Sequence, residues 1–386
     1  MKIKGKLVFD KHSGKLIGFT SLGDPDLDYS TFEELEVATH VLAFMIRGVQ
    51  TTLKFMLAYF LTQTVVSYQL APLFWRAVGI LELNCDLHVV ATSSDGMSAN
   101  RKFYRLHKHI MGEESKILNK TINLFAPQRN IWFFADVPHL MKTTRDLDLG
   151  LHQLPKLTIE HIHLTSYAKM RVNLAVQILS KSMAEALRRS MPLEEVSETA
   201  TFCQLMNDFF DCCNVRSGHE HQRKQNPLLA PYEKCDDPRF VWLTDTFLQY
   251  FVDWKEAISK REGFTPDGMT RMFISIQTYE GLQMSVNSLI ECTKFLLGNG
   301  VSYVLTERFM QDCLEEYFGH QRQRGRRSDN PDAVQFGYND RILQIQRNAG
   351  LVSRGNVGSR QKAGESRWAT IREEPLPKKK KEKKQN

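Results

Sequence analysis

The chain has 386 residues, of which 42% are hydrophobic, and it carries a formal net charge of +7. This length is sufficient for two or three domains with substantial cores. No apolar run reaches the ~18 residues that a membrane span requires, and the first residues contain no apolar signal segment. We therefore expect a globular protein without a membrane partner.

The cysteines argue against a disulfide-stapled protein. There are seven of them, an odd number, and no two form a Cys-x-x-Cys pair. Disulfide scaffolds and structural zinc sites usually show paired spacings. We expect free thiols in a reducing compartment, which means the cytosol or the nucleus.

The positive charge is concentrated at the C-terminal end. From His320 onward the chain contains 17 Lys and Arg against 7 Asp and Glu, and the arm ends in the lysine-rich segment Pro375–Lys384. Such an arm suits a polyanion or a nuclear import receptor. A solvated, disordered tail without a partner is the alternative. On the first interpretation we expect the protein in the nucleus.

The N-terminal part is rich in strand patterns. Lys15–Thr20 predicts a short strand, and the apolar runs His40–Val49 and Leu53–Leu61 predict a hairpin. Further along we expect a helix over Val65–Leu83, a strand over Leu87–Thr92, a helix over Ala99–Met111 and a strand over Asn130–Asp136. This order of strands and helices is that of a ribonuclease-H-like sheet.

From about residue 149 the apolar spacing becomes helical. We expect helices over His161–Ser182, Met183–Arg189, Thr199–Cys213, Phe240–Lys260 and Met269–Leu297. The predicted fold is α/β, a ribonuclease-H-like mixed sheet interrupted by a mainly helical insertion domain. The predicted domains are residues 1–148, the helical insertion 149–275, the rest of the sheet domain 276–348, and a basic tail 349–386.

Three carboxylates could belong to a metal site. Asp95 and Asp136 each end a predicted strand, and Glu315 lies on a predicted helix. Two-metal phosphoryl transfer needs hard oxygen ligands around cations a few ångströms apart. In the simpler interpretation, Asp95 is a turn aspartate before Gly96 and Asp136 prepares the turn at Pro138. Glu315 is then an exposed glutamate on a helix. Spacing alone leaves the choice open.

Longer motifs surround these carboxylates and carry a family resemblance. They are Ser94–Asn100, Phe134–Thr143 and Leu305–Gly319. All three resemble the P-element transposase family, which includes THAP-domain relatives in animals, and the resemblance runs to about residue 347. The last motif, in which Asp312 and Glu315 stand three residues apart, is the most specific.

The resemblance implies a ribonuclease-H-like catalytic domain interrupted by a GTP-binding insertion. It implies Mg²⁺-dependent DNA cleavage and strand transfer at transposon ends through an Asp-Asp-Glu triad. On this reading Asp95 is the second aspartate and Glu315 the glutamate, both catalytic and both metal ligands. A homo-oligomer on DNA is also expected. The family's THAP zinc finger does not occur in this sequence.

The first acidic residue of the triad is not evident. In relatives the end of the opening strand carries Asp-Leu-Gly, whereas this chain has Ser21 within Phe19–Gly23. Asp24 and Asp26 follow, but a shift of three residues moves a side chain about 10 Å and reverses its face. Relatives also carry an Asp-Glu pair before Met-Lys-Ile-Lys, which would lie upstream of Met1. We expect an incomplete triad, with the first carboxylate replaced at Ser21 or lost upstream.

Two segments resemble the guanine-nucleotide-binding insertion of the family, namely His161–Ala175 and Phe209–Ser217. No Gly-x-x-x-x-Gly-Lys loop is present, which excludes a P-loop mode. By resemblance, the residues expected to contact GTP are Lys169, Asp211, Asn214 and Asp312. An aspartate can accept from guanine ring N–H groups, and a lysine can meet phosphate. In the alternative interpretation, Lys169 is a surface lysine, and Asp211 and Asn214 form an ordinary helix end.

A zinc site is a weaker possibility in the same region. His161 and His163 could combine with Cys212 and Cys213. Structural zinc ligands normally stand two to four residues apart in both halves, and adjacent cysteines do not easily ligate one ion. We do not expect zinc.

These patterns lead to two hypotheses. The first is a P-element-type DNA transposase fragment or domesticated derivative, inactive in cleavage if its first acidic residue is missing. The alternative is a non-catalytic nuclear protein that binds DNA or assembles on it, with a GTP-binding module.

Overall fold

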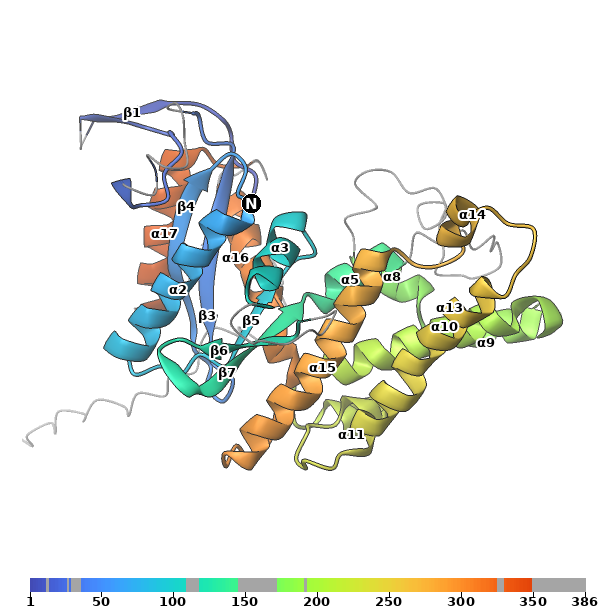
Figure 1. The fold of residues 1–386 in the computed structure, drawn as a ribbon. Helices are drawn as coiled ribbons and strands as arrows, with labels where there is room; N and C mark the ends of the chain where they lie inside the picture. Colours follow the sequence, from blue (N-terminus) through green and yellow to red (C-terminus); the bar gives the residue numbers. More distant parts are fainter. Residues whose placement is uncertain are drawn as a thin grey trace, which may run out of the picture.

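A computed structural model describes residues 1–11, 14–25, 28, 36–108, 118–144, 172–190, 193–324 and 330–348 of the chain. Strands and their covering helices form one part of the molecule, and a bundle of helices forms the other (Figure 1). The long helix α15 (Ile276–Gly298) lies between the two parts and contacts both. The predicted α/β class with a mainly helical region is confirmed.

Two antiparallel strand pairs stand at the N-terminal side. The first joins β1 (Val8–Asp10) to β2 (Lys15–Ile17). The second is the predicted hairpin of β3 (His40–Arg47) and β4 (Lys54–Thr62), which is confirmed. Both strands are nearly continuous apolar runs, because helices and loops cover much of the hairpin on both faces.

The strand β7 (Ala126–Ala135) is the centre of the three-stranded sheet. It pairs in parallel with β5 (Ala91–Ser94) and antiparallel with β6 (Lys120–Asn123). The order β5-β7-β6 places the end of β5 beside the end of β7. The strand that we predicted at Leu87–Thr92 corresponds to β5, which begins a few residues later, at Ala91. The strand β6 was not predicted.

Alternation along β7 divides the core between two faces. Ile131 and Phe133 face a cluster formed with α2 (Ser67–Asn84) and α3 (Ser98–Leu106). Trp132 and Phe134 face the larger cluster that extends into the helical part. A strand buried on both faces in this way fixes the register of its neighbours, because a slip by one residue would exchange the two sets.

Helix α15 approaches β7 closely because small residues line its contact. Ser285 donates a hydrogen bond to the carbonyl of Ala135 at 3.0 Å, and Ser288 donates to the carbonyl of Phe133 at 2.5 Å. At Gly281 an added Cβ would lie 2.6 Å from Leu140. These contacts attach the helical part to the sheet at β7.

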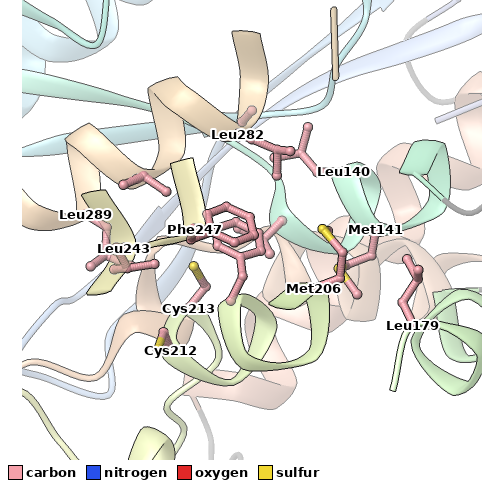
Figure 2. Close-up of a cluster of buried hydrophobic side chains, with 14 of the residues drawn as sticks. Leu140, Met141, Leu179, Met206, Cys212, Cys213, Leu243, Phe247, Leu282 and Leu289 are labelled. Carbon is pink, nitrogen blue, oxygen red and sulfur yellow. The ribbon is translucent and has the colours of Figure 1, made fainter. Parts of the chain in front are cut away.

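The helical part continues from the end of β7. Its elements are α5 (Val137–Thr144), α8 (Val172–Ile178), α9 (Lys181–Ser190), α10 (Leu193–Cys213), α11 (Glu220–Lys224), the 3-10 turn η1 (Pro227–Leu229), α12 (Pro238–Val241), the π-helical η2 (Trp242–Leu248), α13 (Gln249–Ser259) and α14 (Pro266–Arg271). Phe209 and Phe247 stack at 4.5 Å in the cluster that Figure 2 shows.

The prediction of a single helix over Met269–Leu297 is wrong. The run Met269–Leu297 is divided between α14 and α15, because Ser275 accepts the N–H of Thr278 at 3.1 Å and starts a new helix. The predicted helix over Phe240–Lys260 is confirmed as a continuous stretch of α12, η2 and α13.

The chain then returns to the sheet. After the 3-10 turn η3 (Thr306–Phe309), helix α16 (Asp312–Gln323) and helix α17 (Ala333–Asn348) lie beside the β3–β4 hairpin (Figure 1). Tyr317 and Phe336 from these helices pack with Met56 of β4. Within the described residues, no helix is both long and apolar enough to span a membrane.

Candidate active site

Asp95 directly follows β5 and is held by the turn into α3. Its Oδ1 accepts the backbone N–H of Met97 at 3.1 Å and the side-chain amide of Asn100 at 2.8 Å. Its Oδ2 makes no hydrogen bond with the described residues. Asp95 therefore has the turn role that the simpler reading gave it, and it still presents one carboxylate oxygen that no described residue uses.

Glu315 comes to the same place from a distant part of the chain. It lies in the first turn of α16 and is exposed, and its carboxylate makes no hydrogen bond with the described residues. Glu315 and Asp95 both act electrostatically on the imidazole of His139, which lies in the first turn of α5 after β7. The structure thus brings the two predicted carboxylates to one imidazole.

His139 is kept neutral by its surroundings. Burial is the main cause that lowers the pKa of His139, and Lys142 lowers it further, whereas Asp95 and Glu315 oppose the shift. Gly96 allows this packing, because an added Cβ would lie 3.3 Å from Cδ2 of His139. No sequence pattern indicated that His139 would lie beside Asp95 and Glu315, although the residue belongs to the motif Phe134–Thr143.

Asp136 lies beside these groups but below the surface. Only 3% of the residue is exposed, and burial is the main cause that raises the pKa of Asp136 to about 6. The nearby carboxylates of Glu315 and Asp312 raise it as well. Both carboxylate oxygens of Asp136 already accept backbone N–H groups, from Gln311 at 3.1 Å and from His139 at 3.2 Å.

The structure does not bring Ser21 to this place. Ser21 donates its N–H to the carbonyl of Leu61 on the edge of β4 that faces away from β3, while Val41 of β3 exchanges two backbone hydrogen bonds with Met1 on the opposite edge. The order across the sheet is therefore Ser21, β4, β3 and Met1. Three strand spacings of about 4.8 Å separate Ser21 from Met1 by roughly 14 Å.

Asp95 lies on the Met1 side of this order. Its carboxylate acts electrostatically on the amino group of Met1, whose pKa is lowered mainly by burial and by Arg322 and is raised by Asp95. Asp24 forms an ion pair with Arg76 at 3.2 Å, and Asp26 lies outside the described residues. Of the described residues of this segment, neither Ser21 nor Asp24 joins Asp95 and Glu315.

The residues present fit a divalent cation only in part. Carboxylate oxygens are the hard donors that Mg²⁺ prefers, and Asp95 and Glu315 both have oxygens to offer. Within the described ranges, no group of three or more His, Cys, Asp or Glu side chains is arranged to hold a metal ion. A third carboxylate would be needed to complete the set.

The predicted nucleotide residues form a second polar site near the end of α10. Asp211 Oδ2 accepts the side-chain amides of Asn207 at 3.0 Å and Asn226 at 2.8 Å, and burial is the main cause that raises the pKa of Asp211. Asn214 follows the helix. Lys169 lies outside the described residues, as do His161 and His163.

Arg216, which was not predicted, connects this polar site to helix α16. Its Nε donates to Asn214 Oδ1 at 2.9 Å, and its Nη2 lies 3.3 Å from Asp312 Oδ2 at the start of α16. Three of the four predicted nucleotide residues are therefore linked along one stretch. Asp312 is also one helical turn from Glu315.

A buried junction fixes the same two regions against each other. The hydroxyl of Thr306, which is 1% exposed, donates to the carbonyl of Cys212 at 3.0 Å and accepts the N–H of Val215 at 3.1 Å. Glu307 pairs with Arg47 at the end of β3 at 2.5 Å. The insertion, the sheet and the Glu315 helix thus meet at residues 304–312.

The adjacent cysteines belong to the apolar core. Cys212 and Cys213 are 0% and 2% exposed and lie among the side chains of Figure 2. Burial raises the pKa of Cys212 to about 12 and raises that of Cys213 as well. Neutral thiols in this position pack as small apolar groups and do not form a metal site.

Comparisons with known families identify two consecutive domains. Residues 1–108 match the family described as "TNP-like, RNase H N-terminal domain", and residues 117–226 match "TNP-like, GTP-binding insertion domain". The second match includes Asp211 and Asn214.

A curated relative and a solved structure are similar to the chain. The Transposable element P transposase of Drosophila melanogaster is 29% identical over 239 residues, which cover 54% of this chain and 29% of that protein. The chain therefore spans less than a third of this relative. The Drosophila P element transposase strand transfer complex contains a similar chain, with a TM-score of 0.68, 23% identity, and coverage of 90% of this chain and 75% of that one. This likeness confirms the ribonuclease-H-like fold with an insertion domain.

Proposed function

The chain belongs to the P-element transposase family, and on this premise we propose that it forms the catalytic core of a DNA transposase. Its substrate would be DNA at transposon ends, cleaved and joined with a divalent cation as cofactor. The observation that carries the proposal is that the end of β5, which Asp95 follows, meets the start of α16, which carries Glu315. The side chain of Gln311 donates to the carbonyl of Ser93 at 3.0 Å, and its own carbonyl accepts the N–H of Glu315 at 3.0 Å. We also propose a homo-oligomer on DNA and a nuclear location.

The two carboxylates have a clear chemical role in this proposal. A bound Mg²⁺ would supply charge for the attacking and leaving oxygens of a phosphoryl transfer. Asp95 would offer its unused Oδ2, with its orientation set by Met97 and Asn100. Glu315 would offer its exposed carboxylate from the opposite side. Since the pKa of His139 is lowered, the imidazole stays neutral at neutral pH and adds no positive charge beside the cation.

The free edge of β3 supports an upstream position for the first acidic residue. β3 pairs only with β4, and β5 pairs only with β7, so both strands leave an edge without a partner strand among the described residues. Met1 forms a bonded pair with Val41 on that edge of β3. An extended segment preceding Met1 would continue along β3, antiparallel to it. Its last residues would lie beside Asp95, which Ser21 cannot reach.

Two gain-of-function variants distinguish the two possible positions of the first acidic residue, which are Ser21 and the segment preceding Met1. One carries Ser21→Asp, and the other carries an N-terminal extension that ends in Asp-Glu before Met1. We expect Mn²⁺-dependent cleavage of transposon-end DNA from the extended chain and none from Ser21→Asp. Cleavage by Ser21→Asp alone, or by the unextended chain, would show that the triad is completed differently. Asp95→Asn in the extended chain is the control that should abolish the activity.

We further propose that the insertion binds a guanine nucleotide through Asp211, Asn214, Asp312 and Lys169. The match of residues 117–226 to a GTP-binding insertion supports this, as does the linkage of Asn214 to Asp312 through Arg216. Calorimetry with GTP and ATP tests it. We expect GTP to bind more tightly than ATP and Asp211→Asn to reduce the difference. Equal or absent binding of the two nucleotides would remove the guanine site.

The alternative is a non-catalytic nuclear protein that binds DNA or assembles on it, with a GTP-binding module. The incomplete carboxylate set among the described residues favours it. The two functions differ in one outcome. A non-catalytic protein would bind transposon-end DNA but would not cleave it even with the N-terminal extension.

A further inference from the structure

We propose that Asp136 is a positioning residue, which locks the Glu315 helix against the ends of β5 and β7, and is not a metal ligand. This inference rests on the proposed function, because the position of Glu315 matters for a cation held jointly with Asp95. Sequence alone placed Asp136 among three equivalent carboxylates. The structure separates it from the other two.

The bonds of Asp136 join the two strand ends to the start of α16. Its N–H donates to the carbonyl of Ser94 at 3.0 Å, which fastens the end of β7 to the end of β5. Its Oδ1 accepts the N–H of Gln311 at 3.1 Å, and Gln311 is the residue that precedes α16. Its Oδ2 accepts the N–H of His139 at 3.2 Å.

Gln311 also forms a hydrogen bond of its own with the end of β5. Its side-chain Nε2 donates to the carbonyl of Ser93 at 3.0 Å, so the residue is bound to both strand ends. Its own carbonyl accepts the N–H of Glu315 at 3.0 Å within the first turn of the helix. The position of Glu315 is therefore set one helical turn away from a residue fixed at two points.

The environment of Asp136 does not suit a ligand. Its side chain is buried, and both oxygens are occupied by backbone donors, so a metal bond would require breaking one of them. Asp95 and Glu315 differ in both respects, because each has at least one carboxylate oxygen without a described hydrogen bond. Residues that orient metal ligands without touching the ion typically change metal affinity by about 10–100-fold when they are substituted.

Asp136→Asn is the test variant, because it keeps the shape of the side chain. The amide oxygen can accept one N–H, but the amide NH₂ faces the other donor and breaks that bond. Asp332→Asn is the matched control. Asp332 is equally buried, at 3% exposed, and its Oδ1 accepts the N–H of Gln335 at the start of α17. Both variants remove a buried carboxylate from a helix start, but only Asp136 is bonded to the residue that precedes α16.

Two measurements on the full chain read the effect. The first is the distance distribution between nitroxide labels at Lys102→Cys on α3 and Gln323→Cys on α16, with the exposed Cys85 and Cys235 replaced by serine. The second is Mn²⁺ affinity by calorimetry. We expect Asp136→Asn to broaden the distance distribution and to weaken Mn²⁺ binding by about 10–100-fold, while Asp332→Asn leaves both nearly unchanged.

Three results would overturn the proposal. An unchanged distance distribution with Mn²⁺ binding lost as completely as in Asp95→Asn would make Asp136 a ligand. An unchanged distribution with unchanged affinity would leave it without a role. Equal broadening in Asp332→Asn would show general destabilisation. If neither the parent chain nor the N-terminally extended chain binds Mn²⁺, the proposed function fails, and the distance measurement alone still decides whether Asp136 positions the helix.

Discussion

The hydroxyl of Thr306 offers a sharp test of how the insertion is attached to the Glu315 helix. It is buried, donates to the carbonyl of Cys212 at 3.0 Å, and accepts the N–H of Val215 at 3.1 Å. Thr306→Val removes the hydroxyl but keeps nearly the same volume. The variant therefore opens no cavity. It leaves the buried N–H of Val215 without a partner, whereas the carbonyl of Cys212 keeps the hydroxyl of Tyr232 as a donor at 3.1 Å.

The expected loss follows from the unpaired N–H of Val215. An unsatisfied buried polar group costs roughly 1–3 kcal/mol, so the free energy of unfolding should fall by roughly 1–3 kcal/mol. Urea denaturation, read by the shift in midpoint at constant slope, measures this change. Thr270→Val is the control, because its hydroxyl donates to the carbonyl of Pro266 on an exposed turn of α14. We expect a change of at most about 0.5 kcal/mol there.

A loss in Thr306→Val no larger than that of the control would refute the reasoning. It would mean that the N–H of Val215 finds another partner and that the junction is not held by the side chain of Thr306. A loss in the expected range accompanied by normal nucleotide binding would show that the junction stabilises the fold independently of the nucleotide site.

Two further predictions concern charge. Burial raises the pKa of Asp136 from 3.8 to about 6, so the stability contributed by its protonated form is fully present below about pH 4 and is lost as pH rises through about 6. Relative to Asp136→Asn, the chain should lose up to about 3 kcal/mol of unfolding free energy between about pH 4 and about pH 7, measured by urea titration at each pH; a constant difference would contradict this. Deletion of Lys378–Lys384 should weaken DNA binding and flatten its dependence on salt, measured by fluorescence anisotropy. An unchanged slope would remove the tail from the DNA contact.

Local periodicity was enough to predict several elements that position the site. The hairpin of β3 and β4, the helix α2 and the central strand β7 are long and strongly patterned, so their apolar spacing was informative. The strand β6 was missed because its four residues, Lys120–Asn123, include only one aliphatic side chain and bury the polar residues Thr121 and Asn123, so no apolar period marks it. Asp95 was proposed as a site residue because it stands where a strand stops, and the structure places it directly after β5.

The remaining features depend on contacts between distant segments. Gln311 reaches Asp136 and Ser93 across about two hundred residues of sequence, which no local pattern records. Ser21 seemed suitable for the first acidic residue because of its neighbours in sequence. Its distance from Asp95 follows instead from the strand order, which is set by hydrogen bonds to Leu61.

The most direct test of the proposed site is a Mn²⁺ titration of four chains by calorimetry: the parent, Asp95→Asn, Glu315→Gln and Glu316→Gln. Glu316 is the matched control, since it neighbours Glu315 on α16 but pairs with Lys54 at 3.3 Å. Joint coordination by Asp95 and Glu315 predicts that each of the first two variants weakens binding at least about tenfold and that Glu316→Gln does not. Equal affinity in all four chains would contradict it.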